Sequence, residues 1–161
     1  MSHFAAAVVR DVNGWTAAEL DIAGATDVDD VADRLRDIDP NAKVSLLFVE
    51  SNDTFLAIVR LDEGDDPRVF GSDPAFAAES RIGSVLLADV DGPEPAEHPA
   101  DDDKPQLAEP VGDVDLLSDL GVPAPRLLAL CGREGMLPSD VTAEVCQLVG
   151  CGDEIEELRD A

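Results

Sequence analysis

The chain has 161 residues and a formal net charge of −25, because 36 acidic residues stand against 11 basic ones. Affinity for nucleic acid comes largely from Lys and Arg that displace counterions from phosphates, so this charge disfavours direct binding of RNA or DNA. It favours a basic protein partner, which an acidic surface attracts over long distances when salt is low. High acidity is also typical of proteins from salt-loving organisms, and that alternative explanation of the charge stays open.

The remaining composition indicates a folded protein that does not enter a membrane. Hydrophobic residues make up 45% of the chain, enough for a core, while aromatic residues make up 4%, too few for the stacking platforms that hold single-stranded nucleic acid. The first apolar run, residues 4–9, is too short for a signal peptide or a membrane span. With three cysteines, an odd number, we expect a cytoplasmic protein whose thiols stay reduced.

The first 40 residues predict a hairpin followed by a helix. Residues 4–10 and 15–20 read as strands, and Asn13-Gly14 between them is a strong signal for a tight hairpin turn. Thr26 or Asp27 is expected to cap a helix that Pro40 ends. Its apolar face repeats at steps of three and four residues and consists of Val28, Val31, Leu35 and Ile38.

Three further strands and a second helix complete the first part. Residues 43–50 and 54–60 predict antiparallel neighbours joined by a short turn, and residues 68–70 predict a short strand. A helix follows from Pro74 to Leu86. The order ββαβββα predicts an α+β fold, with an antiparallel sheet of about five strands and helices on one face. That order is the one seen in longin-like and profilin-like domains, an analogy of fold alone.

The rest of the chain divides at a change of composition. Residues 89–112 are rich in Pro and acid, which predicts a flexible, self-repelling linker. Short helices are expected at 115–120 and 123–134, then from a cap at Ser139 to Gly150, and last at 153–159. We therefore predict a sheet domain (1–88), an acidic linker (89–112) and a small helical unit (113–161), and leave open whether that unit docks on the sheet.

No residue pattern indicates catalysis. The sequence lacks a phosphate-binding glycine loop, and His3 and His98 are isolated from any nucleophile pattern. The cysteines lack metal-ligand spacing and read as small buried hydrophobes: Cys131, Cys146 and Cys151. We predict a protein that is not an enzyme and has no cofactor and no metal site. The few basic residues are expected to form ordinary ion pairs or, alternatively, one small cationic spot: Arg10, Arg60, Arg68 and Arg81.

Several stretches together resemble the actinobacterial tRNA adenosine deaminase-associated proteins. They span nearly the whole chain and are not catalytic, so they specify a family better than a chemistry. The stretches are Phe4-Ala-Ala-Ala-Val-Val-Arg-Asp with Gly14-Trp15, Leu46-Leu47-Phe48-Val49-Glu50, Asp66-Pro67-Arg68-Val69-Phe70, the run from Gly112 to Gly121, and the run from Leu148 to Glu154.

The resemblance implies association with the tRNA adenosine deaminase. The family takes its name from this association, which rests mainly on neighbouring genes. The chain is not itself that zinc enzyme, which needs H-x-E and P-C-x-x-C, because His3 is followed by Phe4 and Ala5 and neither motif occurs. We expect an accessory protein whose acidic linker occupies the basic tRNA groove of a partner. The candidate partner-binding residues are Glu94, Glu97, Asp101, Asp102, Asp103 and Glu109.

Three alternatives stay open. The first is a small-ligand or metal-dependent enzyme, although no pocket residues can be named from the sequence. The second is a factor that binds and delivers tRNA, which the charge disfavours. The third is a homodimer formed by strand addition at an exposed edge of the sheet.

Overall fold

The computed structural model describes residues 3–12, 14–20, 22, 24–38, 41–51, 55–62, 67–71, 81–86, 111–112, 115–132 and 137–160. Strands and helices alternate much as the sequence predicts. The elements are β1 (His3–Asp11), β2 (Gly14–Glu19), α1 (Val28–Ile38), β3 (Val44–Ser51), β4 (Phe55–Asp62), β5 (Arg68–Gly71), α3 (Arg81–Leu86), β6 (Val111–Gly112), η2 (Ser118–Leu120), α4 (Ala124–Gly132), α5 (Pro138–Val149) and α6 (Gly152–Asp160).

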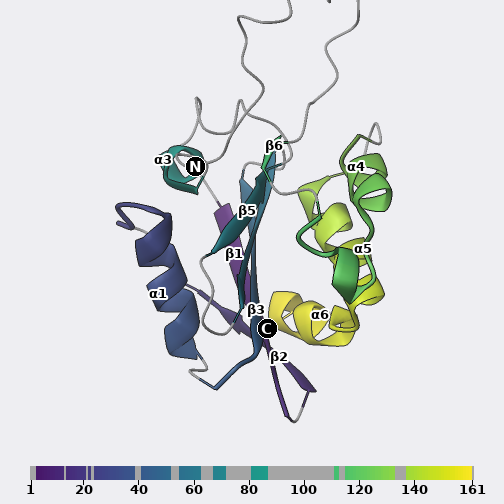
Figure 1. Cartoon of the computed structure of the whole chain (residues 1–161), viewed down its shortest axis with the longest axis horizontal. Helices are drawn as coiled ribbons and strands as arrows, with labels where there is room; N and C mark the ends of the chain where they lie inside the picture. The colour runs from purple at the N-terminus through teal and green to yellow at the C-terminus, as the bar shows by residue number, and fades with distance from the viewer. Residues whose placement is uncertain are drawn as a thin grey trace, which may run out of the picture.

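All strands join one antiparallel sheet in the order β2-β1-β3-β4-β5-β6 (Figure 1). The five strands that the sequence predicts are confirmed, and β6 adds a sixth at the edge beside β5. Its two residues fall within the predicted linker, yet Gly112 pairs with Phe70 and Val111 with Gly71. Its partner strand β5 ends about 40 residues earlier in the chain. The hydrogen bonds between β5 and β6 could therefore not be predicted from the local composition around residues 111–112. The α+β class of the fold is confirmed.

Helix α1 covers one face of the sheet, as its apolar stripe predicts. Val31 and Leu35 pack into a core with Leu47 of β3 and Val59 of β4. Helix α3 lies on the same face, and the first part of the helix predicted from Pro74 lies outside the described residues. The predicted cap is Asp27, whose Oδ1 accepts the N–H of Asp30 at 2.8 Å. That bond satisfies one of the N–H groups that a helix leaves unpaired in its first turn.

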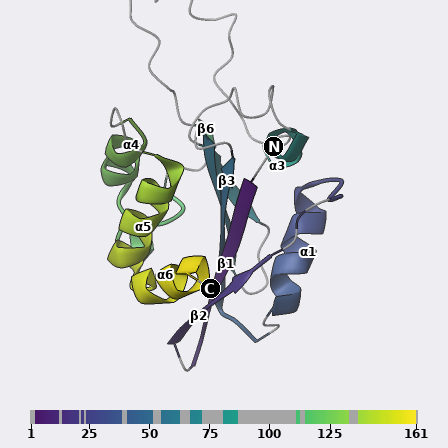
Figure 2. The same cartoon turned by 180° about the vertical axis from the view of Figure 1, so that it is seen from behind.

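The C-terminal helices cover the other face, which answers the question that the sequence left open. Figures 1 and 2 show α4, α5 and α6 on the side of the sheet opposite α1. Ser139 does not cap α5 as expected, because the helix already begins at Pro138. Pro138 fills a position that needs no N–H donor, and the Asp140 carboxylate accepts the N–H of Leu137 at 3.2 Å.

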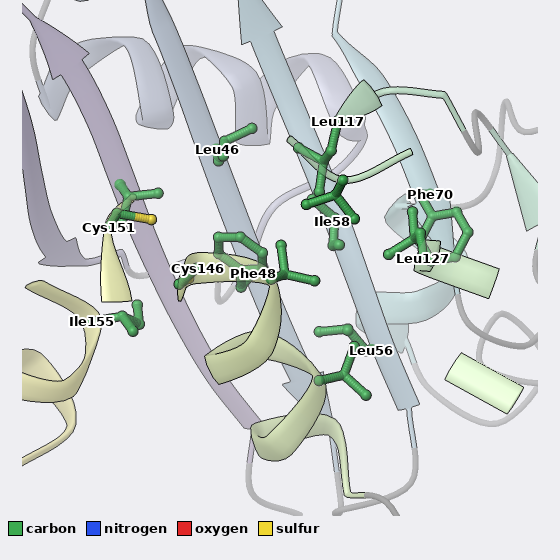
Figure 3. Close-up of a cluster of buried hydrophobic side chains, with 14 of the residues drawn as sticks. Leu46, Phe48, Leu56, Ile58, Phe70, Leu117, Leu127, Cys146, Cys151 and Ile155 are labelled. Atoms are coloured by element: carbon green, nitrogen blue, oxygen red, sulfur yellow. The ribbon is translucent and has the colours of Figure 1, made fainter. Parts of the chain in front are cut away.

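The second core lies between these helices and the sheet (Figure 3). Alternate residues of β3 and β4 point into it, and the C-terminal segment fills it from the opposite side. Residues from both sides are fully buried, so the sheet and the C-terminal helices share one hydrophobic core. Its largest members are Leu46, Phe48, Leu56, Ile58, Phe70, Leu116 and Leu117. None of the helices in the described segments has the length and apolar character that a membrane span requires.

Candidate functional site

The strongest polar cluster in the described part of the chain surrounds Arg60. This residue lies on β4 and is 5% exposed, on the face that the C-terminal segment covers. Its Nε donates to Asp62 Oδ1 at 2.9 Å, and its Nη2 donates to Asp119 Oδ2 at 2.9 Å. Its Nη1 donates to the Leu116 carbonyl and to Asp119 Oδ1. The guanidinium therefore binds its own strand and the η2 turn at once.

Arg68 reinforces this cluster from the next strand. It stands opposite Arg60 in the pairing of β4 with β5, and its Nη2 donates to the Leu116 carbonyl at 3.3 Å. Two cationic side chains thus converge on one carbonyl oxygen. Their shared target is the turn that leads into the C-terminal helices, so the pair fixes the start of that segment on the sheet.

The charges in this cluster stabilise one another. The hydrogen bond from Arg60 is the main reason why the pKa of Asp119 lies below its ordinary value. Its counterpart, the hydrogen bond to Asp119, raises the pKa of Arg60 further above its ordinary range, against the opposing effect of burial. The cluster holds a fixed ion pair, and four of the guanidinium's bonds are already used within the protein. This arrangement clamps two segments together and has little capacity left for an external anion.

Three further arginines among the described residues are also engaged within the protein. Arg10 lies over the ring of Trp15, 5.9 Å from its centroid, and not beside Arg60. On α1, Arg34 pairs with Asp30 and Arg36 with Asp33. The sequence offered two interpretations of the basic residues, and for Arg60 the ion pairing is the one observed. Among the arginines whose side chains are described, Arg60 and Arg68 lie opposite each other on β4 and β5.

Exposed carboxylates dominate two helices on opposite sides of the sheet. On α1 they are Asp29, Asp33 and Asp37, and on α6 they are Asp153, Glu156 and Glu157. Among the described residues no group of three His, Cys, Asp or Glu side chains is arranged to hold a metal ion. The six candidate partner-binding residues lie outside the described residues: Glu94, Glu97, Asp101, Asp102, Asp103 and Glu109.

The remaining candidates for chemistry are buried or not placed. Cys146 and Cys151 are not joined in a disulfide and have 0% exposure in the second core, as expected of small hydrophobes (Figure 3). The side chains of Cys131 and His3 and the whole of His98 lie outside what the structure describes. Thr142 is also fully buried, and its hydroxyl has no hydrogen-bond partner among the residues that the structure describes.

Comparison with models of protein families shows to which family the chain belongs. The model of the Rv3753c-like tRNA adenosine deaminase-associated protein matches residues 3–152. The chain belongs to this family. The match runs through the sheet and through the C-terminal helices as far as the start of α6, so it includes helices from both faces of the sheet. Neither the curated proteins nor the solved structures gave a significant match.

Proposed function

We propose that this protein is a non-catalytic accessory protein that binds a basic protein partner through its acidic surface. The first candidate partner is the tRNA adenosine deaminase, with which the family is associated by name. An enzyme that binds tRNA must offer basic residues to phosphates, and these are the groups that an acidic protein attracts. The proposal places both proteins in the cytoplasm, where thiols such as Cys146 and Cys151 stay reduced.

One observation carries this proposal: the way in which the charges are distributed. The described arginines on α1 and β4 are paired with the protein's own carboxylates, whereas carboxylates on α1 and α6 are exposed. A surface of this kind repels phosphate backbones and attracts cationic groups. The acidic linker adds eight carboxylates within residues 89–112 against one lysine.

We propose that the linker supplies part of the binding surface. Its test is a variant in which six carboxylates become amides of the same size: Glu94→Gln, Glu97→Gln, Asp101→Asn, Asp102→Asn, Asp103→Asn and Glu109→Gln. The control neutralises three carboxylates on the exposed face of α1, and the two variants are compared per carboxylate removed: Asp29→Asn, Asp33→Asn and Asp37→Asn. Affinity for the purified deaminase is measured by titration calorimetry at low and at moderate salt.

We expect the linker variant to lose about tenfold or more in affinity at low salt and to show a flatter salt dependence, because fewer charges contribute. The α1 control should change less. If the linker variant keeps both the affinity and the salt dependence of the wild type, the linker has no part in binding. If the wild type does not bind the deaminase at low salt, that enzyme is not the partner.

A further inference from the structure

The edge strand β2 leaves a row of backbone groups unpaired. The N–H of Leu20 donates to the carbonyl of Ala5 at 3.1 Å, which fixes the phase of the β1–β2 ladder. Since bonded pairs alternate in an antiparallel ladder, Ala18 and Thr16 also face β1. The residues between them turn their N–H and C=O groups away from β1. They are Trp15, Ala17 and Glu19, and no described residue hydrogen-bonds to these outward groups.

Strand β2 has no Pro, no Lys and no bulge, three of the features that usually prevent strand pairing. Natural edge strands are protected by Pro, by Lys, by bulges or by very short length. The sequence of β2 is Gly-Trp-Thr-Ala-Ala-Glu, and its pairing with β1 runs without a break from Ala6↔Glu19 to Asp11↔Gly14. No residue of β2 is fully buried. At the opposite end of the sheet, the described part of β6 is two residues long.

Helix α6 lies beside this edge and carries exposed acidic side chains. It packs against β2 and β1, and Figure 2 shows it next to β2 on one side of the sheet. Trp15 and Ala17 are half-buried on that same face. Glu19 shares their face and is exposed, and the outer side of α6 carries Asp153, Glu156 and Glu157. An added strand would lie beside Glu19 and beside a helix that carries exposed carboxylates.

We propose that an extended basic segment of the partner protein pairs with β2 and continues the sheet at this edge. This inference rests on the proposed function and names the mode of binding. Main-chain hydrogen bonds to Trp15, Ala17 and Glu19 supply affinity, and charge selects the occupant. A second copy of the chain is the poorer occupant, because two chains of net charge −25 would bring their α6 helices together at the dyad.

The geometry also specifies the pattern of the incoming strand. Its residues opposite Trp15, Ala17 and Glu19 place their side chains on the face of α6, because directly paired residues in a sheet share a face. Those positions, at every second residue, should be Lys or Arg. The residues between them lie beside Thr16 and Ala18 on the other face, where no carboxylate of β2 stands.

The decisive variant is Ala17→Pro. The N–H of Ala17 points outward, so proline removes a donor from the open edge without removing a bond to β1. The control on the same strand is Thr16→Ala, which changes an exposed side chain and leaves the backbone intact. A second variant keeps the backbone unchanged and neutralises α6: Asp153→Asn, Glu156→Gln and Glu157→Gln. Its matched control is the threefold α1 variant described above, and thermal unfolding verifies that every variant folds.

The measurement is amide hydrogen exchange by NMR on the full chain. The first probe is a peptide of alternating Val and Lys, and the second is the purified deaminase. We expect the amides of Trp15, Ala17 and Glu19 to exchange fast in the free protein and to slow about tenfold or more with either probe. Thr16 and Ala18 should be protected throughout. Ala17→Pro and the α6 variant should weaken peptide binding, and the two controls should not.

Three results would overturn the inference. The first is a peptide that does not bind, or that binds without protecting these amides. The second is protection of these amides that increases with the concentration of the free protein, which would assign the edge to a second copy of the chain. The third is a deaminase complex in which the three amides still exchange fast; the proposed function would then survive and the edge inference would not. Conversely, protection by the peptide with no binding of the deaminase supports the edge and rejects the named partner.

Discussion

The two faces of the sheet are covered by different parts of the chain and held in different ways. The α1 face is covered by a helix that lies between the strands in sequence and packs against β3 and β4 through apolar side chains. The other face is covered by the segment after residue 115, which packs through a second apolar core and is also joined to β4 by the Arg60 cluster. The comparison shows that local amphipathic patterns build the first layer, whereas long-range polar contacts position the second.

The largest test of this comparison uses two adjacent leucines on β3. Leu46 and Leu47 are both 0% exposed, and they point to opposite faces. Leu46→Ala and Leu47→Ala should each lower the free energy of unfolding by about 2–5 kcal/mol, because each leaves a cavity in a packed core. Chemical denaturation is followed by the near-UV signal of Trp15, which lies on the face of the C-terminal helices, and by far-UV dichroism.

Because both cores share the strands, we expect a single transition for each leucine variant. The division into residues 1–88, 89–112 and 113–161 makes a different prediction. If residues 113–161 unfold by themselves, Leu46→Ala will separate the two signals into two transitions while Leu47→Ala will not.

The next effect concerns glycines that precede each layer. Gly121 has φ +110° and lies in the C-terminal segment, while Gly24 has φ +78° and lies before α1. Alanine in this backbone region costs about 1–2 kcal/mol at either position. At Gly121 the new Cβ would also meet the Leu148 carbonyl oxygen at 2.8 Å, whereas at Gly24 it meets no atom within 4 Å. Gly121→Ala should therefore destabilise the protein more than Gly24→Ala, and equal losses in thermal unfolding would contradict this packing.

A smaller effect is expected from the clamp. Asp119→Asn should cost about 1 kcal/mol at neutral pH, since the Asp119 side chain is 62% exposed and solvent weakens its pairing. The exposed pair of Arg36 with Asp33 is the control, and Asp33→Asn should cost less. Urea unfolding at several pH values gives both comparisons.

The clamp also has a defined pH dependence. Because Arg60 lowers the pKa of Asp119 from its ordinary value of 3.8, the folded state favours the ionised carboxylate. Its contribution is fully present above the ordinary pKa and is lost as pH falls through the lower folded value. The difference between wild type and Asp119→Asn should therefore shrink in strong acid. A difference that stays constant or grows on acidification would show that the Arg60 pairing is not the source.

The smallest effect is a gain in stability in the second core. The buried hydroxyl of Thr142 lacks a partner among the described residues, and an unsatisfied buried group destabilises the fold. Thr142→Val keeps the branched shape and should stabilise the protein by about 1 kcal/mol. Thr16→Val, at an exposed position on β2, should change the melting temperature less. A loss of stability in Thr142→Val would mean that the hydroxyl has a role in the folded protein.

The sequence predicted those parts of the fold that depend on local patterns. The Asn13-Gly14 hairpin, the apolar stripe of α1 and the paired strands β3 and β4 all follow from short-range rules. The unbroken apolar run from Leu46 to Val49 also indicates a strand that is buried on both faces. The prediction of a sheet with helices on one face did not take this signal into account.

Long-range partners could not be predicted in the same way. Arg60 was placed at a strand end, but β4 continues to Asp62, and the partner Asp119 lies 59 residues away. Val111 and Gly112 belong to the sheet because they pair with Gly71 and Phe70 of β5, far away in the sequence. The open edge of β2 emerges only from the strand order, since its own six residues do not show which side of the strand is paired.

The central claim is that an acidic accessory protein binds the basic deaminase, and its most direct test is a calorimetric titration of the full chain into that purified enzyme over a series of salt concentrations. We predict stoichiometric binding at low salt and an affinity that falls steeply as salt rises. No heat of binding at low salt, or an affinity that does not change with salt, would contradict the account.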